Sequence, residues 1–416
     1  MESMSTSRPG VRKKFSKRTL ETRPLPTTGD VVVISPRGAE RLKAGHVWVY
    51  RSDIVSAKEI SPGAVVPVHD HRGKFLGTAL YSSSSQIAVR MISPALVPDL
   101  AELLRKRIRQ AIAYRQQVVR DSDAYRLVFS EGDFLPGLIV DRYHDILSLQ
   151  ILTQAMDAEP VRSAILGELQ ELLKPASIAE RVDARVRDLE QLPARSSGLL
   201  AGKRGNTVFT MNGVRFHFDA LEGQKTGAFL DQRENYAAAV EYTRGETLDM
   251  FCYQGGFALH LAKKAAKVTG VDSSRSALEV ADKNALLNQS DIEWIEANAF
   301  DLLKDYSQAG RHFDTIVLDP PAFAKSRKNL ETAIRGYKEL NLRALKMLRP
   351  GGILVTCSCS YHVSESEFVE VVAEAARDAR RTVRLLEKRG AAKDHPAVLG
   401  VPETSYLKCL IIHASQ

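Results

Sequence analysis

The sequence predicts an α/β protein in which a doubly wound, mostly parallel sheet follows two smaller domains. The chain has 416 residues, too many for one ordinary core, so two or three domains are expected. From about residue 245 onward, apolar strand patterns alternate strictly with helical patterns, which is typical of a parallel sheet covered on both faces. Residues 29–95 instead hold short β-branched segments separated by glycine, proline and aspartate.

The composition is that of a soluble globular protein, with 44% hydrophobic and 26% charged residues. No stretch of about 18 apolar residues occurs, so no membrane span is expected. The basic, polar N-terminus lacks the apolar core of a secretory signal. Four cysteines in a chain of this length do not indicate a disulfide framework. We therefore expect a cytoplasmic protein in a reducing compartment.

More than half of the net charge lies at the N-terminus. The chain carries a net charge of +8, and residues 1–28 contribute +5 of it. A flexible cationic tail can bind phosphates, because each neutralised phosphate releases counterions. The same composition also fits a solvated tail that only aids solubility.

Two small domains are expected before the parallel sheet. The segments VVVISP, HVWVY, GAVVPVHD, KFLGTALY and QIAVRMI predict a compact, barrel-like β-domain over residues 29–95, with a short helical piece after the first strand. Residues 96–212 predict a small α+β domain. It begins with an amphipathic helix over about 97–120, continues with three strands, and has a further helix over about 158–173.

The C-terminal domain, residues 213–416, is expected to hold the parallel sheet. Its strands are predicted at ETLDMFC, KVTGVD, IEWIEANAF, FDTIVLD and ILVTCS, with an RPGG turn before the fifth. Two further β-like segments, RTVRLLEK and YLKCLIIHA, close the chain. In open α/β sheets, ligands bind beyond the carboxyl ends of the strands, so we sought candidate site residues there.

The ends of the first three strands favour a nucleoside cofactor. The first leads into Gly255 and Gly256, which let the backbone approach a ligand at a helix N-terminus. The pattern is not G-x-G-x-x-G, which argues against NAD. Asp272 follows the second strand, where an acidic residue usually holds ribose hydroxyls, although Asp272 or Ser273 could instead cap the next helix. Asn298 follows the third strand and could bond an adenine edge.

The fourth strand ends in the strongest local signal, Asp319-Pro320-Pro321-Ala322-Phe323. Two successive prolines remove two backbone donors and fix a rigid exit from the strand. An aspartate and an aromatic held in this way suit a planar nucleobase, the carboxylate at its polar edge and the ring near its face. The alternative is a strand-ending turn followed by a helix that starts at a proline.

The fifth strand ends in Thr356-Cys357-Ser358-Cys359 and should face the same cleft as the fourth. Residues i and i+2 of a strand share a face, so both thiols could point one way. A zinc site would need four ligands, and no second cysteine pair or histidine cluster with ligand spacing is found, so no metal is expected. A redox pair would normally show C-x-x-C at a helix start. Packing and nucleophilic catalysis remain as the two readings.

Together these pieces resemble a class I S-adenosylmethionine-dependent methyltransferase with a Rossmann-like sheet. From about residue 30 onward the chain is similar to the RlmI-type ribosomal RNA large subunit methyltransferases, which make 5-methylcytosine. The motifs that carry this resemblance are GHVWVY at 45–50, which looks like part of a PUA domain, FLPGLIVDR at 134–142, EGQKTGAFLDQR at 222–233, DPPAF at 319–323, RGYK at 335–338 and DHP at 394–396.

The resemblance implies S-adenosylmethionine as cofactor and RNA as substrate. It implies that the Cys359 thiolate adds to carbon 6 of a cytosine and that Asp319 bonds the edge of that base. The candidate cofactor-binding residues are Phe251, Tyr253, Gly255, Gly256, Asp272, Asn298, Asp319 and Gln232, and the candidate RNA-contacting residues are Pro320, Pro321, Phe323, Arg233 and Lys225.

The chain departs from the family pattern at one position, lacks the second cysteine of many 5-methylcytosine enzymes, and leaves one thiol unassigned. The family commonly has a lysine after the two prolines, where this chain has Ala322. Many 5-methylcytosine enzymes use a second cysteine after the fourth strand to release the adduct, and that position is Pro320 here. Another group must therefore take the carbon-5 proton. The family has one cysteine after the fifth strand, in a Ser-Cys-Ser context that matches Ser358-Cys359-Ser360, so the resemblance implies Cys359 as the nucleophile. Cys357 falls where relatives can carry an apolar residue.

Two other functions fit parts of the sequence. An exocyclic-amine methyltransferase for adenine or guanine also uses an acidic or amide residue followed by Pro-Pro-aromatic, and it needs no thiol. A non-catalytic RNA-binding assembly protein would use the PUA-like unit and the basic tail alone. The sequence does not decide between ribosomal and transfer RNA as the substrate, or between a monomer and a homodimer.

Overall fold

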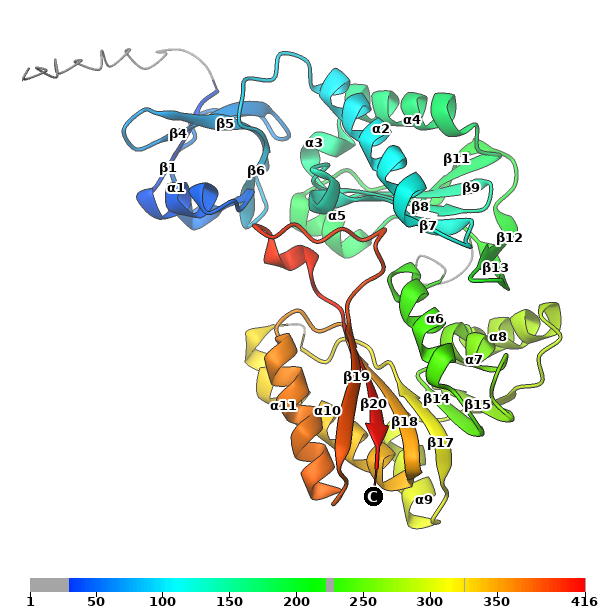
Figure 1. Ribbon diagram of the computed structural model, residues 1–416. Coiled ribbons are helices and arrows are strands. Elements are labelled where there is room, and N and C mark those ends of the chain that lie inside the picture. The colour runs from blue at the N-terminus through cyan, green and yellow to red at the C-terminus, as the bar shows by residue number, and fades with distance from the viewer. Residues whose placement is uncertain (1–29, 222–227, 325, 416) are drawn as a thin grey trace, which may run out of the picture.

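The computed structural model describes residues 30–221, 228–324 and 326–415. The predicted basic tail at 1–28 and the candidate Lys225 lie outside these ranges. The described chain forms an N-terminal β-domain, a central domain and a C-terminal domain with a large sheet (Figure 1). The α/β class predicted from the sequence is confirmed.

The N-terminal domain is a six-stranded sheet in the order β2-β6-β5-β4-β1-β3. Only the β1–β4 pair is parallel. The helix expected after the first strand starts with Ser35, whose side chain accepts a hydrogen bond from the Gly38 amide. Strand β3, which pairs with β1, was not predicted. The elements are β1 (Val32–Ile34), α1 (Pro36–Lys43), β2 (Trp48–Tyr50), β3 (Ile54–Ser56), β4 (Val65–Asp70), β5 (Phe75–Tyr81) and β6 (Ile87–Ser93).

The central domain is a five-stranded sheet in the order β11-β10-β9-β8-β7. Helices α2 and α4 bury their apolar stripes on it, as the predicted amphipathic patterns require. Its elements are α2 (Leu100–Val118), β7 (Ala124–Phe129), β8 (Leu138–Tyr143), β9 (Ile146–Ile151), α3 (Gln154–Asp157), α4 (Glu159–Leu173), β10 (Ser177–Glu180), α5 (Ala184–Glu190) and β11 (Gly198–Gly202).

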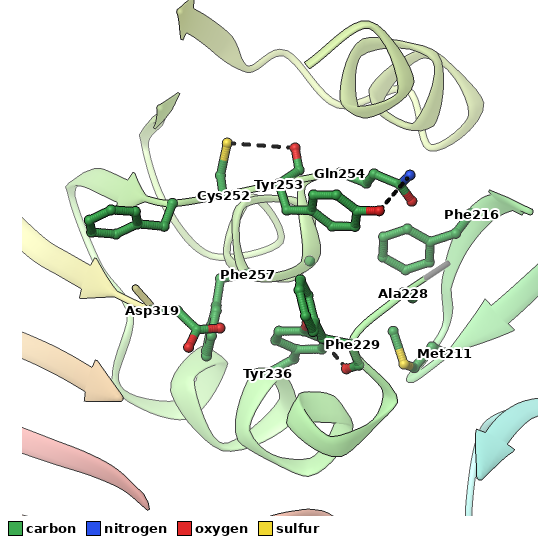
Figure 2. A pocket seen from close by; sticks show the side chains of 12 residues that line it. Met211, Phe216, Ala228, Phe229, Tyr236, Cys252, Tyr253, Gln254, Phe257 and Asp319 are labelled. Atoms are coloured by element: carbon green, nitrogen blue, oxygen red, sulfur yellow. Dashed lines mark hydrogen bonds between the residues drawn. The ribbon is translucent and has the colours of Figure 1, made fainter. Parts of the chain in front are cut away.

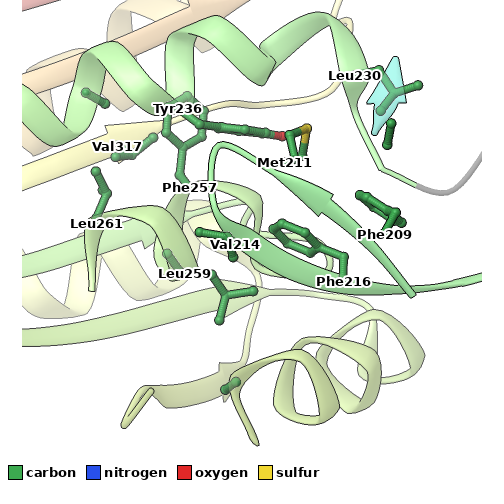
Figure 3. Packing of buried hydrophobic residues seen from close by; sticks show 14 of the residues in the cluster. Phe209, Met211, Val214, Phe216, Leu230, Tyr236, Phe257, Leu259, Leu261 and Val317 are labelled. Atoms are coloured by element: carbon green, nitrogen blue, oxygen red, sulfur yellow. The ribbon is translucent and has the colours of Figure 1, made fainter. Parts of the chain in front are cut away.

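A β-hairpin that the sequence analysis did not separate joins the central and C-terminal domains. It consists of β12 (Asn206–Met211) and β13 (Val214–Asp219), and it spans the expected domain boundary between residues 212 and 213. Asn212 and Gly213 both have positive φ, 50° and 73°, as a tight hairpin turn requires. The apolar face of the hairpin belongs to a core cluster that reaches from the central sheet to the helices of the C-terminal domain (Figure 3).

The C-terminal domain contains a seven-stranded sheet in the order β16-β15-β14-β17-β18-β20-β19. The first five strands of this order are parallel, and β20 runs antiparallel to both of its neighbours. Its elements are α6 (Arg233–Tyr242), β14 (Glu246–Met250), α7 (Gly256–Leu261), β15 (Lys267–Asp272), α8 (Arg275–Leu287), β16 (Glu293–Glu296), α9 (Ala299–Gln308), β17 (Phe313–Leu318), α10 (Leu330–Met347), β18 (Leu348–Ser358), α11 (Glu365–Asp378), β19 (Val383–Arg389) and β20 (Lys408–Ala414).

Helices cover both faces of this sheet, so its strands read as apolar runs. Helices α6, α7 and α8 pack on one face together with the hairpin, and α9, α10 and α11 pack on the other. The expected turn at 349–352 lies inside β18 instead. The pairing of β18 with β17 shifts register between Phe313 and Thr315, so the strand absorbs the proline and glycines as an irregularity.

The segment between β19 and β20 runs back toward the two other domains (Figure 1). Asp394 in this segment is fully buried. Its carboxylate accepts hydrogen bonds from Arg233 Nη2 at 2.8 Å and from the Arg126 amide at 2.8 Å. Its main-chain oxygen accepts one from Arg115 Nη2 at 2.7 Å. Asp394 therefore ties α2 and β7 of the central domain to α6 of the C-terminal domain.

Candidate active site

The loop after β14 has a backbone conformation that few sequences can adopt. Phe251, Tyr253 and Gly255 have positive φ of 66°, 50° and 85°. At Gly256 a Cβ atom would lie 2.5 Å from the hydroxyl of Tyr236. The two glycines were predicted to let the backbone approach a ligand. Gly256 is also required by packing, because a larger residue would collide with Tyr236.

Asp272, at the end of β15, fastens this loop. Its Oδ2 accepts a hydrogen bond from the Tyr253 amide at 2.9 Å, and its Oδ1 accepts one from the Ser274 amide at 2.8 Å. The cap of α8 is Ser274, whose hydroxyl accepts from Ala277, so neither Asp272 nor Ser273 has the capping role that the sequence left open. The carboxylate of Asp272 stays half-buried at the carboxyl edge of the sheet.

A cavity opens in front of this loop, with about 390 Å³ of empty space that is partly open to solvent. Phe229, Tyr236 and Phe257 gather around it, and the carboxylate of Asp319 lies at one side (Figure 2). Its lining residues are Met211, Phe216, Ala228, Phe229, Tyr236, Phe251, Cys252, Tyr253, Gln254, Gly256, Phe257 and Asp319.

Four of the predicted cofactor-binding residues, Phe251, Tyr253, Gly256 and Asp319, meet at this cavity. Asn298 does not line it. This side chain is exposed, and its Oδ1 accepts a hydrogen bond from the Phe300 amide at 2.9 Å, so its oxygen caps α9.

Gln232 does not line the cavity but donates a hydrogen bond to the Asp319 carboxylate, so its predicted contact with the cofactor stays a prediction. It is 2% exposed, and its Nε2 donates to Asp319 Oδ1 at 3.0 Å. Asn235 Nδ2 donates to Gln232 Oε1 at 2.6 Å and so fixes which way the amide points. Gln232 therefore orients the Asp319 carboxylate.

Asp319 is partly buried, and its surroundings disfavour the ionised carboxylate. Burial, and then the negative charge of Asp231, raise its pKa to about 7, although the hydrogen bond from Gln232 works in the opposite direction. A carboxyl group with this pKa can hold or release a proton near neutral pH, as general acid–base chemistry requires.

The ends of β17 and β18 bring a thiol beside the two prolines. Cys359 follows the last residue of β18 and is half-buried, with its Sγ 3.8 Å from the Pro320 carbonyl oxygen. Cys357 is fully buried in the core and lies opposite Cys409 of β20. The structure thus supports packing as the role of Cys357. All four cysteines are free thiols.

The Cys359 thiol lies among charges of both signs. Burial, and then Asp319 and Asp231, raise its pKa to about 12, whereas the cation of Lys408 lowers it. Neither Lys408 nor Asp231 was predicted as a site residue. A lysine inside the apolar run YLKCLII was the available signal for the first, and Asp231 lay unremarked within the quoted DQR motif.

The predicted RNA-contacting residues have different environments. Pro321 is exposed, Pro320 is buried, and the half-buried Phe323 packs its ring 4.8 Å from that of Tyr337. Arg233 is 2% exposed and paired with Asp394, an environment that does not favour its predicted contact with RNA.

Within residues 30–221, 228–324 and 326–415, no group of three or more His, Cys, Asp or Glu side chains could hold a metal ion. In the same described ranges, no helix is long and apolar enough to cross a membrane.

Comparison with known proteins places this site in a family. A PUA-like domain model matches residues 32–94, and an S-adenosylmethionine-dependent methyltransferase model matches residues 140–412. The ribosomal RNA large subunit methyltransferase I of Photobacterium profundum is 38% identical over 389 residues, which cover 89% of this chain and 96% of the relative. The chain belongs to this methyltransferase family. The Aeromonas hydrophila protein of the same name is 39% identical over 393 residues, 91% of this chain and 98% of the relative.

Solved structures support the fold. The methyltransferase SMU.776, crystallised as a complex with SAH, superposes with a TM-score of 0.80 at 20% identity, covering 92% of this chain and 99% of that chain. An S-adenosylmethionine-dependent methyltransferase from Streptococcus mutans has a TM-score of 0.79, with the same identity and coverage.

S-adenosylmethionine is the cofactor of the family, and the residues present fit it. The cavity joins aromatic walls to two carboxylates, Asp319 in its lining and Asp272 just behind the loop. These are the apolar and polar surfaces that a nucleoside with a charged sulfonium group needs. The PUA-like domain and the Rossmann-like sheet predicted from the sequence are confirmed.

Proposed function

We propose that this protein transfers a methyl group to carbon 5 of a cytosine in RNA, through a covalent adduct with Cys359. The observation that carries the proposal is the meeting of the Cys359 thiol with the Asp319-Pro320 segment at the ends of adjacent parallel strands. The names of the curated relatives favour 23S ribosomal RNA, the RNA of the large subunit, as the substrate.

The thiol is needed because carbon 5 of cytosine is a poor nucleophile. Addition of the Cys359 thiolate to carbon 6 forms a carbon–sulfur bond and makes carbon 5 enamine-like. S-adenosylmethionine supplies the methyl group that carbon 5 takes up. Carbon 5 then loses its proton to a base, the carbon–sulfur bond breaks, and the thiolate leaves. Because Pro320 stands where many such enzymes have a second cysteine, that base is not a cysteine at this position.

Asp319 bonds the cytosine edge in this proposal. With a pKa of about 7, it can share a proton with ring nitrogen 3 as negative charge develops in the adduct. Gln232 holds the carboxylate in place from behind. Pro321 and Phe323 lie next to Asp319 along the chain and are the residues that we expect to contact the base or its neighbours.

Phe251, Tyr253, Gly256 and Asp272 would hold the cofactor in this proposal. The first three line the cavity, and Asp272, which holds the loop from outside the lining, would accept hydrogen bonds from the ribose hydroxyls as well. Gly255 keeps the loop in its left-handed conformation.

Trapping with RNA that contains 5-fluorocytosine tests the chemistry. Fluorine at carbon 5 cannot leave as a proton does, so the adduct should persist as a protein–RNA band in a denaturing gel. Cys359→Ala should form no band and transfer no radiolabelled methyl group, while still binding S-adenosylmethionine by calorimetry. Cys357→Ala is the matched control and should keep substantial activity, because its thiol lies in the core.

The outcomes separate the competing functions. Methyl transfer without a trapped band would indicate an exocyclic-amine methyltransferase, and equal loss of activity in both cysteine variants would contradict the assignment of the nucleophile. No methyl transfer to total RNA would indicate a binding or assembly role. If methyl transfer occurs, mass spectrometry of ribosomal and transfer RNA from cells that lack the protein should find one lost 5-methylcytosine. The RNA that lacks this base is the substrate.

A further inference from the structure

Lys408 is a buried cation that forms no ion pair with the described residues of the chain. It is the first residue of β20, is 7% exposed, and lies opposite Ser358 in the antiparallel ladder with β18. In the described part of the chain, no salt bridge within 4.0 Å joins it to a carboxylate. Burying a charge without a partner is costly, so a lysine in this position is expected to serve a neighbouring group.

The hydrogen bonds of Lys408 hold its ammonium group at the turn that follows Cys359. Its Nζ donates to the main-chain oxygen of Ser360 at 2.7 Å and to that of Tyr406 at 2.8 Å. Ser360 directly follows Cys359, and its hydroxyl lies 2.9 Å from the Tyr337 hydroxyl. The turn that carries the thiol is thus held from β20 on one side and from α10 on the other.

The other titratable groups around the thiol are acidic. Asp319 faces it from the end of β17, Asp231 from the turn before α6, Tyr406 from the segment before β20, and Tyr337 from α10. Negative charge on any of them disfavours a thiolate. Lys408 is the cation in the described part of the chain that acts on Cys359 in the opposite direction.

We propose that Lys408 is a positioning residue, whose ammonium group stabilises the thiolate of Cys359 and whose hydrogen bond to Ser360 fixes the thiol at the end of β18. The proposal rests on Cys359 being the nucleophile. Burial lowers the pKa of Lys408 to about 8, although Cys359 and Glu367 oppose this shift. The stabilisation is therefore present below about pH 8 and is lost above it as the ammonium group gives up its proton.

The rate of alkylation of Cys359 by iodoacetamide, followed by mass spectrometry of its peptide, tests this inference. The thiolate is the reactive form, and the other three cysteines are buried. At pH 7, Lys408→Met should slow the reaction about tenfold or more, because an adjacent opposite charge is worth about one pKa unit or more. Above about pH 9 the two rates should converge, because the native lysine is then neutral as well.

Two further variants separate charge from hydrogen bonding. Lys408→Arg keeps the charge and should retain most of the native rate at pH 7. Lys408→Gln keeps a donor for Ser360 without the charge and should be slow. Lys388→Met, which removes a half-exposed lysine of the neighbouring strand β19, is the matched control and should leave the rate unchanged.

Equal alkylation rates at pH 7 for the native protein and for folded Lys408→Met and Lys408→Gln variants would overturn the inference. If the Met variant does not fold, the comparison of Gln with Arg decides. The measurement needs no RNA. Failure of the proposed function would instead appear as methyl transfer by Cys359→Ala, whatever the alkylation rates.

Discussion

At the residue scale, burial distinguishes side chains that are chemically the same. Cys357 and Cys359 are two residues apart. Cys357 is fully buried in β18, opposite Cys409 of β20, whereas Cys359 follows the end of β18 and lies beside the Pro320 carbonyl oxygen. The same contrast holds for charges, because Asp394 forms an ion pair with Arg233, whereas Asp319 accepts a hydrogen bond from the amide of Gln232 and lies near the negative charge of Asp231.

Asp319 should lower the stability of the protein at neutral and alkaline pH. Its folded pKa, about 7, is above the usual value of about 4. The folded state therefore holds this proton more tightly, and stability is lost as the pH rises between these two values. We expect Asp319→Asn to abolish methyl transfer and to raise the free energy of unfolding, by about 1–2 kcal/mol more at pH 8 than at pH 5. Urea titrations at the two pH values measure this difference, and a gain that does not depend on pH would contradict it.

Asp272 should matter for cofactor affinity. Asp272→Ala removes both the carboxylate available to the ribose and the acceptor that fixes the Tyr253 amide. We expect the affinity for S-adenosylmethionine, measured by calorimetry, to fall at least tenfold. Ser274→Ala removes the neighbouring helix cap and is the control, because it should lower stability and leave the affinity largely unchanged. Unaltered affinity in Asp272→Ala would remove this residue from the cofactor site.

At the element scale, one loop and one strand pair build the site. The loop after β14 combines left-handed residues with close contact to α6, and the β17–β18 pair brings its two ends together because parallel neighbours end at the same edge.

Gly256→Ala tests the close contact of this loop. The added methyl group would lie 2.5 Å from the Tyr236 hydroxyl, so α6 and the loop must move apart. We expect a loss of about 1–3 kcal/mol in the free energy of unfolding and a weaker affinity for S-adenosylmethionine. Gly167→Ala in α4 is the matched control, because no atom lies within 4 Å of the new methyl group and alanine favours a helix. Equal stability of the two variants would contradict this account.

At the scale of the whole molecule, Asp394 joins the central and C-terminal domains through residues of three elements. Burial would raise its pKa, but His395 and Arg233 together hold that pKa well below the usual value. The contribution of Asp394 to stability is therefore complete above about pH 4 and is lost only as the pH falls through the lower folded value.

Asp394→Asn leaves the Arg233 guanidinium buried without its carboxylate. We expect the free energy of unfolding to fall by about 3 kcal/mol, by the same amount at pH 6 and pH 8. Lys388→Ala, which breaks a half-exposed pair with Glu365, is the control and should cost less than about 1 kcal/mol. Urea unfolding measures both variants, and equal losses would show that the buried link is not important for stability.

From the sequence alone one can predict the parallel strands of the C-terminal sheet, the glycine loop, the Asp319-Pro320-Pro321 exit and the family. These features depend on periodicity, turn chemistry and local motifs, all of which neighbouring residues carry. The sequence could not place the hairpin between two domains, because no local pattern tells which core an apolar face will join.

Which charged groups lie close together is visible only in the folded protein. Arg233 forms an ion pair with Asp394, which is 161 residues away, and Gln232 donates a hydrogen bond to Asp319. Lys408 and Cys359 become neighbours because β20 returns antiparallel beside β18. Electrostatic interactions depend on the distance between the groups and on their burial. Both depend on how distant segments of the chain pack together, which the spacing of residues in the sequence does not show.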